Sequence, residues 1–135
     1  MVKRTIKYTD YFGVEREEDF YFSITAPELI EWEREDPTGS LAKKLEGIVN
    51  SENPIEILGI IRWIVMKSYG VRSEDGRFFK KSDEISEMFT QSAAYEEMYI
   101  SFLENPELAI EFINSVIPKK LPKNVSMELQ KMTTT

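Results

Sequence analysis

The sequence predicts an α+β fold that is mainly α-helical: an N-terminal β-hairpin, then a bundle of about five to six helices with a small second hairpin. Two patterns carry this prediction. Apolar residues alternate along the first 25 residues, as in half-buried strands, and from Thr25 onward they recur at helical spacing. The 135 residues are 41% hydrophobic and 12% aromatic, which suffices for one packed core. We therefore expect a single domain over residues 1–117 and a flexible basic tail over residues 118–135.

The first 25 residues have the pattern of a β-hairpin. Three residues share one parity of the first strand: Val2, Ile6 and Tyr8. Residues 12–14 supply the turn, with a glycine at their centre. Three residues mark the inward face of the second strand: Phe20, Phe22 and Ile24. The charged run at residues 15–19 is expected to be the solvated end of this hairpin.

Helical spacing begins with a capping signal. Thr25 and Glu28 have the spacing of a capping box, in which each side chain bonds the other's backbone. The turn residues at 36–39 end this first helix. Ser40 caps a second helix, whose apolar residues recur on one face: Leu41, Leu45, Ile48 and Val49.

The third helix is the most informative segment. It begins at Asn53, an N-cap followed by a proline at the first helical position. It is expected to run to about Tyr69, with Gly70 as its C-terminal cap. Residues 55–66 leave almost no polar face, which predicts a central core helix with some apolar surface left for a partner.

The remaining elements follow from turn and cap residues. An Asp-Gly turn at residues 75–76 closes a small second hairpin between residues 71–72 and 78–79. Three further helices begin at N-cap residues: Ser82, Ser92 and Asn105. Pro118 stops the last of them.

Two missing residue types exclude several kinds of chemistry. Without cysteine the chain has no disulfide, thiolate nucleophile or Cys-based metal site. Without histidine it has no imidazole base and no Ser-His-Asp triad. No glycine-rich nucleotide motif occurs, and we expect no cofactor. Residues 1–10 lack the apolar segment of a signal peptide, and no stretch is apolar enough to span a membrane.

Charge is unevenly distributed. Residues 118–135 carry four lysines and one glutamate, a net charge of +3, so the other 117 residues carry −10 of the total of −7. An acidic body repels phosphate backbones, which disfavours nucleic-acid binding by the folded domain. The basic end is most simply a solubilising tail.

Carboxylates are the only abundant groups of a catalytic type. Four of them cluster near the end of the first helix: Glu31, Glu33, Glu35 and Asp36. Paired carboxylates can bind Mg²⁺ or hydrolyse glycosides, but a charged helix surface explains this cluster better. The acidic turn at residues 73–76 lacks the alternating ligands of a calcium loop. The residues thus favour an interaction protein over an enzyme, and a carboxylate-only metal hydrolase is the third choice.

Aromatic and methionine side chains at helical spacing are usually core residues, and less often an interaction surface. The apolarity of residues 55–66 favours an apolar groove between helices that contacts a client or a neighbouring copy. The candidate contact residues are Trp63, Met66, Tyr95, Met98 and Tyr99.

Five segments in this order carry a family resemblance. They are TIKYTDYFG at residues 5–13, FYFSIT at 20–25, KSYGVRSEDGR at 67–77, FTQSAAY at 89–95 and FINSVIP at 112–118. Together they resemble the tail assembly chaperones of long-tailed phages and prophages of Gram-positive bacteria. The resemblance spans roughly residues 4–118.

This resemblance implies a non-enzymatic role. Such chaperones coat the long tape measure protein in the host cytoplasm, keep it soluble, help recruit tail tube subunits and are absent from the finished particle. It also implies multimerisation along the client. Many members exist in a second, longer form made by frameshifting, and residues 118–135 are where this divergence would fall. The family has no catalytic residues to transfer.

One alternative from another class stays open. A small phage- or host-encoded regulatory or inhibitory protein could use the acidic body as a decoy for a basic partner. Acidic residues scattered around a strong helical core favour it less than the chaperone.

Overall fold

The computed structural model describes residues 1–35, 47–48, 50–51 and 53–118. Along the chain these residues form β1 (Val2–Thr9), β2 (Glu15–Phe22), α1 (Ala26–Glu35), α3 (Pro54–Ser68), β3 (Tyr69–Arg72), β4 (Phe79–Lys80), α4 (Asp83–Thr90), α5 (Ala93–Glu104) and α6 (Pro106–Val116). The predicted α+β class, mainly helical with an N-terminal strand pair, is confirmed. Most of the predicted second helix, and the predicted tail beyond Pro118, lie outside the described residues.

The first hairpin is longer than the sequence predicts. β1 and β2 pair antiparallel along their whole length, from Val2 opposite Phe22 to Thr9 opposite Glu15. Residues 15–19 are exposed at the turn end of the hairpin, as expected, and they also form the first half of β2, which was not predicted. Strand pairing uses only backbone groups, so these charged side chains can stay exposed while their backbone is paired.

A carboxylate holds the turn of this hairpin. Asp10 accepts hydrogen bonds from the backbone N–H groups of Phe12 and Val14, both at 2.9 Å, and from Arg16 Nε at 2.6 Å. The hydrogen bond from Arg16, followed by those from the backbone, lowers the pKa of Asp10. Gly13 lies at φ 85°, a left-handed conformation that favours glycine. The turn is therefore well defined, and it holds Phe12 in solvent at 95% exposure.

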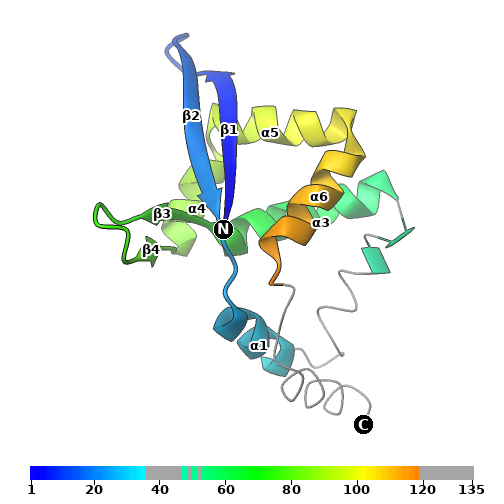
Figure 1. The fold of residues 1–135 in the computed structure, drawn as a ribbon. Coiled ribbons are helices and arrows are strands. Elements are labelled where there is room, and N and C mark those ends of the chain that lie inside the picture. Colours follow the sequence, from blue (N-terminus) through cyan, green and yellow to red (C-terminus); the bar gives the residue numbers. More distant parts are fainter. Residues whose placement is uncertain (36–46, 49, 52, 119–135) are drawn as a thin grey trace.

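The predicted second hairpin is present and joins the first in one sheet. The strand order is β1-β2-β3-β4, and all neighbours are antiparallel. β3 pairs with β2 only through Tyr21 opposite Gly70 and Phe22 opposite Tyr69. In Figure 1 the β3–β4 hairpin extends away from the first hairpin, which stands upright beside it.

Helix α3 passes directly into strand β3. It ends at Ser68, and Tyr69 is already extended, with φ −67° and ψ 137°. The expected C-terminal cap at Gly70 is therefore wrong, because Gly70 is a strand residue. A Cβ atom at Gly70 would lie 2.6 Å from Phe79 Cε2 and 2.8 Å from the Lys80 carbonyl oxygen. Glycine stands here because β4 approaches too closely for any side chain.

Five of the predicted N-terminal caps are confirmed, and the sixth, Ser40, lies outside the described residues. At α1 the Glu28 carboxylate accepts from Thr25 N at 3.0 Å, and Thr25 Oγ1 accepts from Glu28 N at 3.4 Å, which completes the capping box. Four other N-cap side chains accept hydrogen bonds from backbone N–H groups in the first turn of their own helices: Asn53, Ser82, Ser92 and Asn105.

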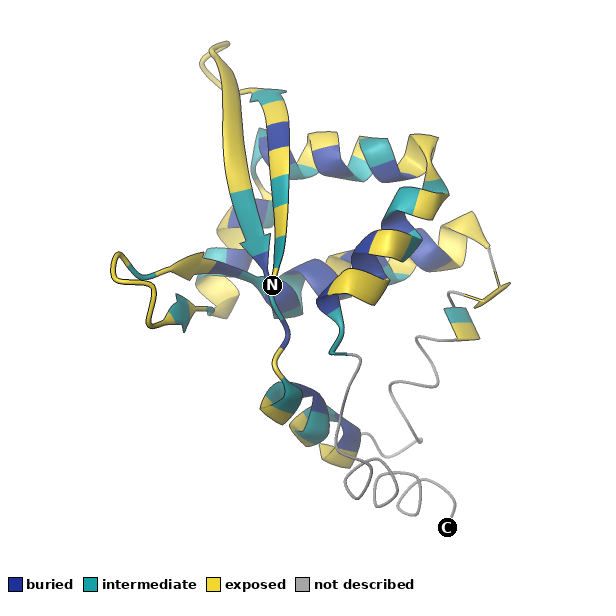
Figure 2. Cartoon of the chain, in the orientation of Figure 1, coloured by how far each residue is buried: buried dark blue, intermediate teal, exposed yellow. Residues whose placement is uncertain are grey.

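The core forms where the hairpin meets the helices. As predicted, α3 is the central helix, and four of its side chains are fully buried: Ile57, Ile61, Ile64 and Val65. The Phe22 ring lies 5.1 Å from that of Phe112 and 5.7 Å from that of Phe89, which stacks on Tyr69 at 4.3 Å. Figure 2 shows β2 partly buried near its base and exposed at its far end, whereas buried and exposed residues alternate along β1.

One ammonium group ties three elements together. Lys81 Nζ donates to the Ser23 carbonyl at 2.8 Å, to Glu28 Oε1 at 2.7 Å and to the Lys67 carbonyl at 3.0 Å. These acceptors lie just after β2, in the first turn of α1 and near the end of α3. All three donors of the ammonium are therefore used, and the lysine fixes the junction of the sheet with α1 and α3.

Glycine-to-alanine exchange is expected to have opposite effects at two positions. Gly70→Ala should lower the free energy of unfolding by about 1–3 kcal/mol, because the new methyl group clashes with backbone and ring atoms. Gly59→Ala, inside α3 with no atom within 4 Å of the new Cβ, should raise it by about 0.5–1 kcal/mol. Urea unfolding measures both. Equal effects at the two positions would contradict the close packing of β3 on β4.

The junction at Lys81 is expected to depend on pH. Burial of the Glu28 carboxyl opposes its ionisation, but hydrogen bonds from Lys81 and Thr25 outweigh burial and lower its pKa. The ionised Glu28 carboxylate therefore contributes to the free energy of unfolding above its ordinary pKa of 4.5. This contribution is lost as the pH falls through the lowered pKa.

Glu28→Gln should therefore destabilise the chain by about 1 kcal/mol near neutral pH and by progressively less in acid. Unfolding by urea at a series of pH values measures this. Glu31→Gln, on the exposed side of α1, is the control and should change stability little. A deficit in Glu28→Gln that is constant with pH would refute the ion pair.

Candidate functional site

An open groove runs between helices α3 and α5. It has a volume of about 460 Å³, and its lining residues are Leu58, Gly59, Arg62, Tyr95, Glu96 and Tyr99. We call this the α3–α5 groove. Its walls combine an aliphatic side chain, two tyrosine rings and a glycine backbone, with Arg62 and Glu96 as its only charged residues. Such a surface suits an apolar segment with a few polar groups.

Gly59 forms the open part of the α3 wall. No atom of the described residues lies within 4 Å of the position its Cβ would take, so the helix surface is hollow there. Ile55 lies one turn earlier on α3 and is 82% exposed, which is unusual for a large aliphatic side chain. The outer face of α3 therefore continues the groove with exposed apolar surface towards the start of the helix.

The α5 wall is held by aromatic contacts. Tyr95 packs its ring 5.8 Å from that of Phe89, in the core, and 6.0 Å from that of Tyr99. Burial raises the pKa of the Tyr95 hydroxyl, and the nearby Tyr99 raises it further. Arg62 acts in the opposite direction but does not cancel this rise. The Tyr95 hydroxyl thus stays neutral at physiological pH, and the α5 wall combines its ring with Tyr99 and the charged Glu96.

The five predicted contact residues separate into three groups. Tyr95 and Tyr99 line the α3–α5 groove. Trp63 and Met66 are half-buried elsewhere: the Trp63 ring packs 5.6 Å from that of Trp32 on α1, and the Met66 carbonyl accepts from Ser86 on α4. Met98 is only 2% exposed, so its side chain lies in the core and does not line the groove. It shares the buried face of α5 with Ala94 and Phe102, which lie four residues before and after it.

Four residues of the groove were not predicted as contact residues, namely Glu96 on α5 and three residues on α3: Leu58, Gly59 and Arg62. A signal for the three on α3 exists, because residues 55, 58, 59 and 62 recur at i, i+3, i+4 and i+7 and so share one helix face. The central glycine marks the place where that face is hollow.

A second concave surface lies between strand β2 and the turn of the second hairpin. It has a volume of about 670 Å³ and is lined by residues 18–21 and 69–76. We call this the β2–β3 cleft. Arg72 crosses it, with its guanidinium 3.8 Å from the centre of the Tyr21 ring and Nη2 donating to the Tyr21 hydroxyl at 2.8 Å.

The described residues of the acidic cluster at the end of α1 differ in burial and do not form a metal site. Glu33 is buried at 7% exposure, whereas Glu31 and Glu35 are exposed, and Asp36 lies outside the described residues. Among the residues that the structure describes, no group of three acidic side chains could hold a metal ion. None of the described helices is long and apolar enough to cross a membrane.

Comparison with known proteins gives one match. A family model described as phage tail assembly chaperone matches residues 1–135, which is the whole chain. No curated protein and no solved structure matches. The match agrees with the resemblance seen in the five sequence segments, and it covers the hairpins, the helices and both concave surfaces. The chain therefore belongs to the family of phage tail assembly chaperones.

Proposed function

We propose that this chain is a non-enzymatic chaperone that binds the tape measure protein of a long-tailed phage or prophage through the α3–α5 groove. It acts in the host cytoplasm, keeps this client soluble, helps recruit tail tube subunits and does not enter the finished particle. Membership of the tail assembly chaperone family supports the general role. The single observation that supports the surface is the open apolar groove beside the hollow at Gly59.

The shape and chemistry of the groove suit a helix of the client. A tape measure protein, as the resemblance implies, is a long helical chain with apolar stripes that would otherwise aggregate. An amphipathic helix can place apolar side chains at i, i+4 and i+7 into a groove of this kind. The tyrosine rings supply rigid contact area, and the glycine lets the client helix come close to α3.

The acidic exterior serves the same role. The chain carries a net charge of −7, with 24 acidic residues against 17 basic ones. A chaperone of high net charge keeps a complex with an apolar client in solution. Family membership favours this role over a regulatory protein that uses its acidic body as a decoy.

The proposed chaperone works as an oligomer along its client. A tape measure protein is far longer than one groove, so several copies are needed to cover its apolar stripes. The frameshift-extended second form implied by the resemblance would add a further partner of the same assembly. Light scattering of the chain with and without the client measures the number of copies.

Blocking the groove is expected to abolish client binding without loss of the fold. Gly59→Leu places a side chain where the groove is hollow, and it improves helix propensity, so the variant should remain folded. On co-expression, the soluble fraction of the tape measure protein should fall to that seen without the chaperone.

The matched control is Ser115→Leu, which adds the same side chain to an exposed position of α6. It should leave the client soluble. If the client is equally soluble without any chaperone, the chaperone function is refuted. If Gly59→Leu protects the client as well as the native chain, the function stands but the groove is the wrong surface.

A further inference from the structure

Strand β2 has a backbone edge that is open over most of its length in the described part of the chain. All of its residues pair with β1 on one side, but only Tyr21 and Phe22 pair with β3 on the other. Figure 1 shows the upper half of β2 rising beyond β3 with no strand drawn beside it on that side. Unpaired N–H and C=O groups along such an edge can pair with another extended segment.

The register identifies which backbone groups are free. In an antiparallel strand, the groups that point to one side belong to alternate residues. Ser23 N donates to the Ser68 carbonyl at 2.8 Å on the side of β3, and the next residue of this parity, Tyr21, lies opposite Gly70. Continuing the alternation toward the turn, the free groups belong to Asp19, Glu17 and Glu15.

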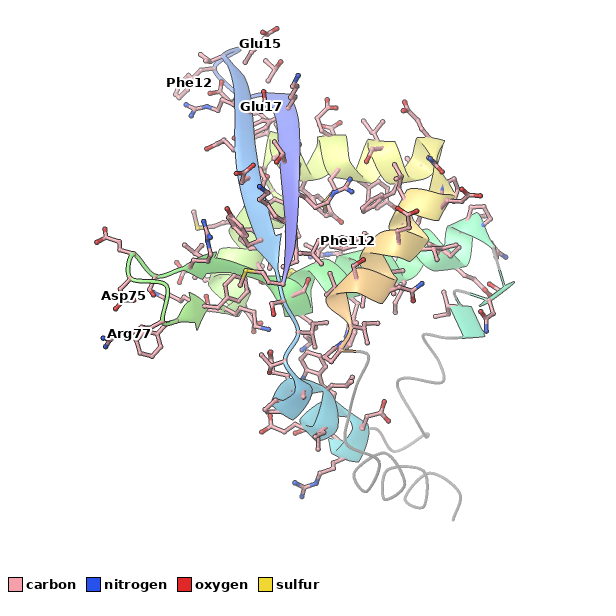
Figure 3. All side chains as sticks on the ribbon, in the orientation of Figure 1. Phe12, Glu15, Glu17, Asp75, Arg77 and Phe112 are labelled. Carbon is pink, nitrogen blue, oxygen red and sulfur yellow. The ribbon has the colours of Figure 1, made fainter. Side chains whose placement is uncertain are left out.

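Each residue with free backbone groups therefore carries an acidic side chain. All three of these side chains are exposed. The adjoining β2–β3 cleft adds Glu18, Glu74 and Asp75, against Arg72, whose guanidinium is held by Tyr21, and Arg77, which pairs with Asp75 at 3.7 Å. Figure 3 shows Glu15 and Glu17 on the free half of the first hairpin and Asp75 at the tip of the second.

We propose that the open edge of β2 binds a lysine-rich extended segment of a partner protein as an additional strand. Backbone hydrogen bonds to Glu15, Glu17 and Asp19 supply the pairing, and lysines at alternate positions lie beside the three carboxylates. This site uses the sheet instead of the helices, so it is separate from the α3–α5 groove and goes beyond the proposed client site.

Charge complementarity determines the kind of partner. An acidic segment would place its side chains against carboxylates, and like charges on neighbouring strands are destabilising, whereas a neutral segment would gain no ion pair. A nucleic acid is repelled for the same reason. Acidic side chains on an edge also prevent unspecific sheet pairing, so a test must separate this protective role from binding.

The test uses the full chain and two labelled synthetic peptides of alternating lysine and threonine. One peptide has a normal backbone, and the other is N-methylated at every residue, which keeps each lysine charge but removes every backbone donor. Fluorescence anisotropy should show that the normal peptide binds at least about tenfold more tightly than the N-methylated peptide. On binding, amide exchange should slow at Glu15, Glu17 and Asp19, and not at Arg16 and Glu18, which face β1.

A charge reversal provides the second arm. Position 15 lies opposite the neutral Thr9, so Glu15→Lys creates no like-charge pair directly across the hairpin. This substitution should weaken binding of the normal peptide by about tenfold. Glu104→Lys makes the same change in net charge at the exposed end of α5 and should have little effect.

Four results would overturn the proposal. Equal binding of the two peptides would show simple charge attraction. Equal effects of the two charge reversals would show that the edge is not the site. Slow amide exchange at Glu15, Glu17 and Asp19 in the free chain would show that the edge is already occupied. Absence of peptide binding would assign the acidic edge its protective role alone.

Discussion

The fold depends on the direct passage of helix α3 into strand β3. The helix is the buried centre of the domain, and the strand that follows it pairs with β2 without an intervening loop. The position of the sheet is thereby set by the position of the core helix. Lys81 reinforces this junction, because its ammonium bonds the ends of β2 and α3 and the start of α1 at once. Removing its hydrogen bonds would leave two partly buried carbonyl groups without a donor.

Both proposed binding surfaces follow from this constraint. Because one face of α3 packs into the core, its outer face at Leu58 and Gly59 can form a groove with α5. Because β3 leaves β2 after two residue pairs and turns into the second hairpin, the rest of the β2 edge stays open. A rigid junction thus carries an apolar site on the helical side and an acidic site on the sheet. Rigid surfaces of this kind bind with less loss of conformational entropy than mobile loops.

Local signals in the sequence predicted most of the elements. The caps at Thr25, Asn53, Ser82, Ser92 and Asn105 are short-range interactions between a side chain and the next turn, so spacing alone reveals them. The same holds for the Asp-Gly turn and for the core position of α3. What the sequence could not show was pairing between distant segments. Gly70 looked like a helix cap because its real neighbour, Phe79, is known only once β3 and β4 are paired.

The candidate surface shows the same limit. Tyr95, Met98 and Tyr99 form one stripe at helical spacing, and their side chains are all of a contact-forming kind. Only the packing of α5 shows that Met98 is at the buried centre of the stripe and that the two tyrosines lie at its edge. The acidic half of β2 was correctly expected to be exposed, but its strand pairing was not predicted, since charged residues rarely indicate a strand when the partner strand is unknown.

Site-specific photo-crosslinking in cells tests the central claim most directly. A benzophenone amino acid replaces Tyr99 in the α3–α5 groove or, as a matched position, Ser115 on α6, and the tape measure protein is co-expressed. If the groove binds the client, crosslinks to the tape measure protein will form from position 99 and not from position 115. Crosslinks of equal yield from both positions, or from position 115 alone, would contradict the account.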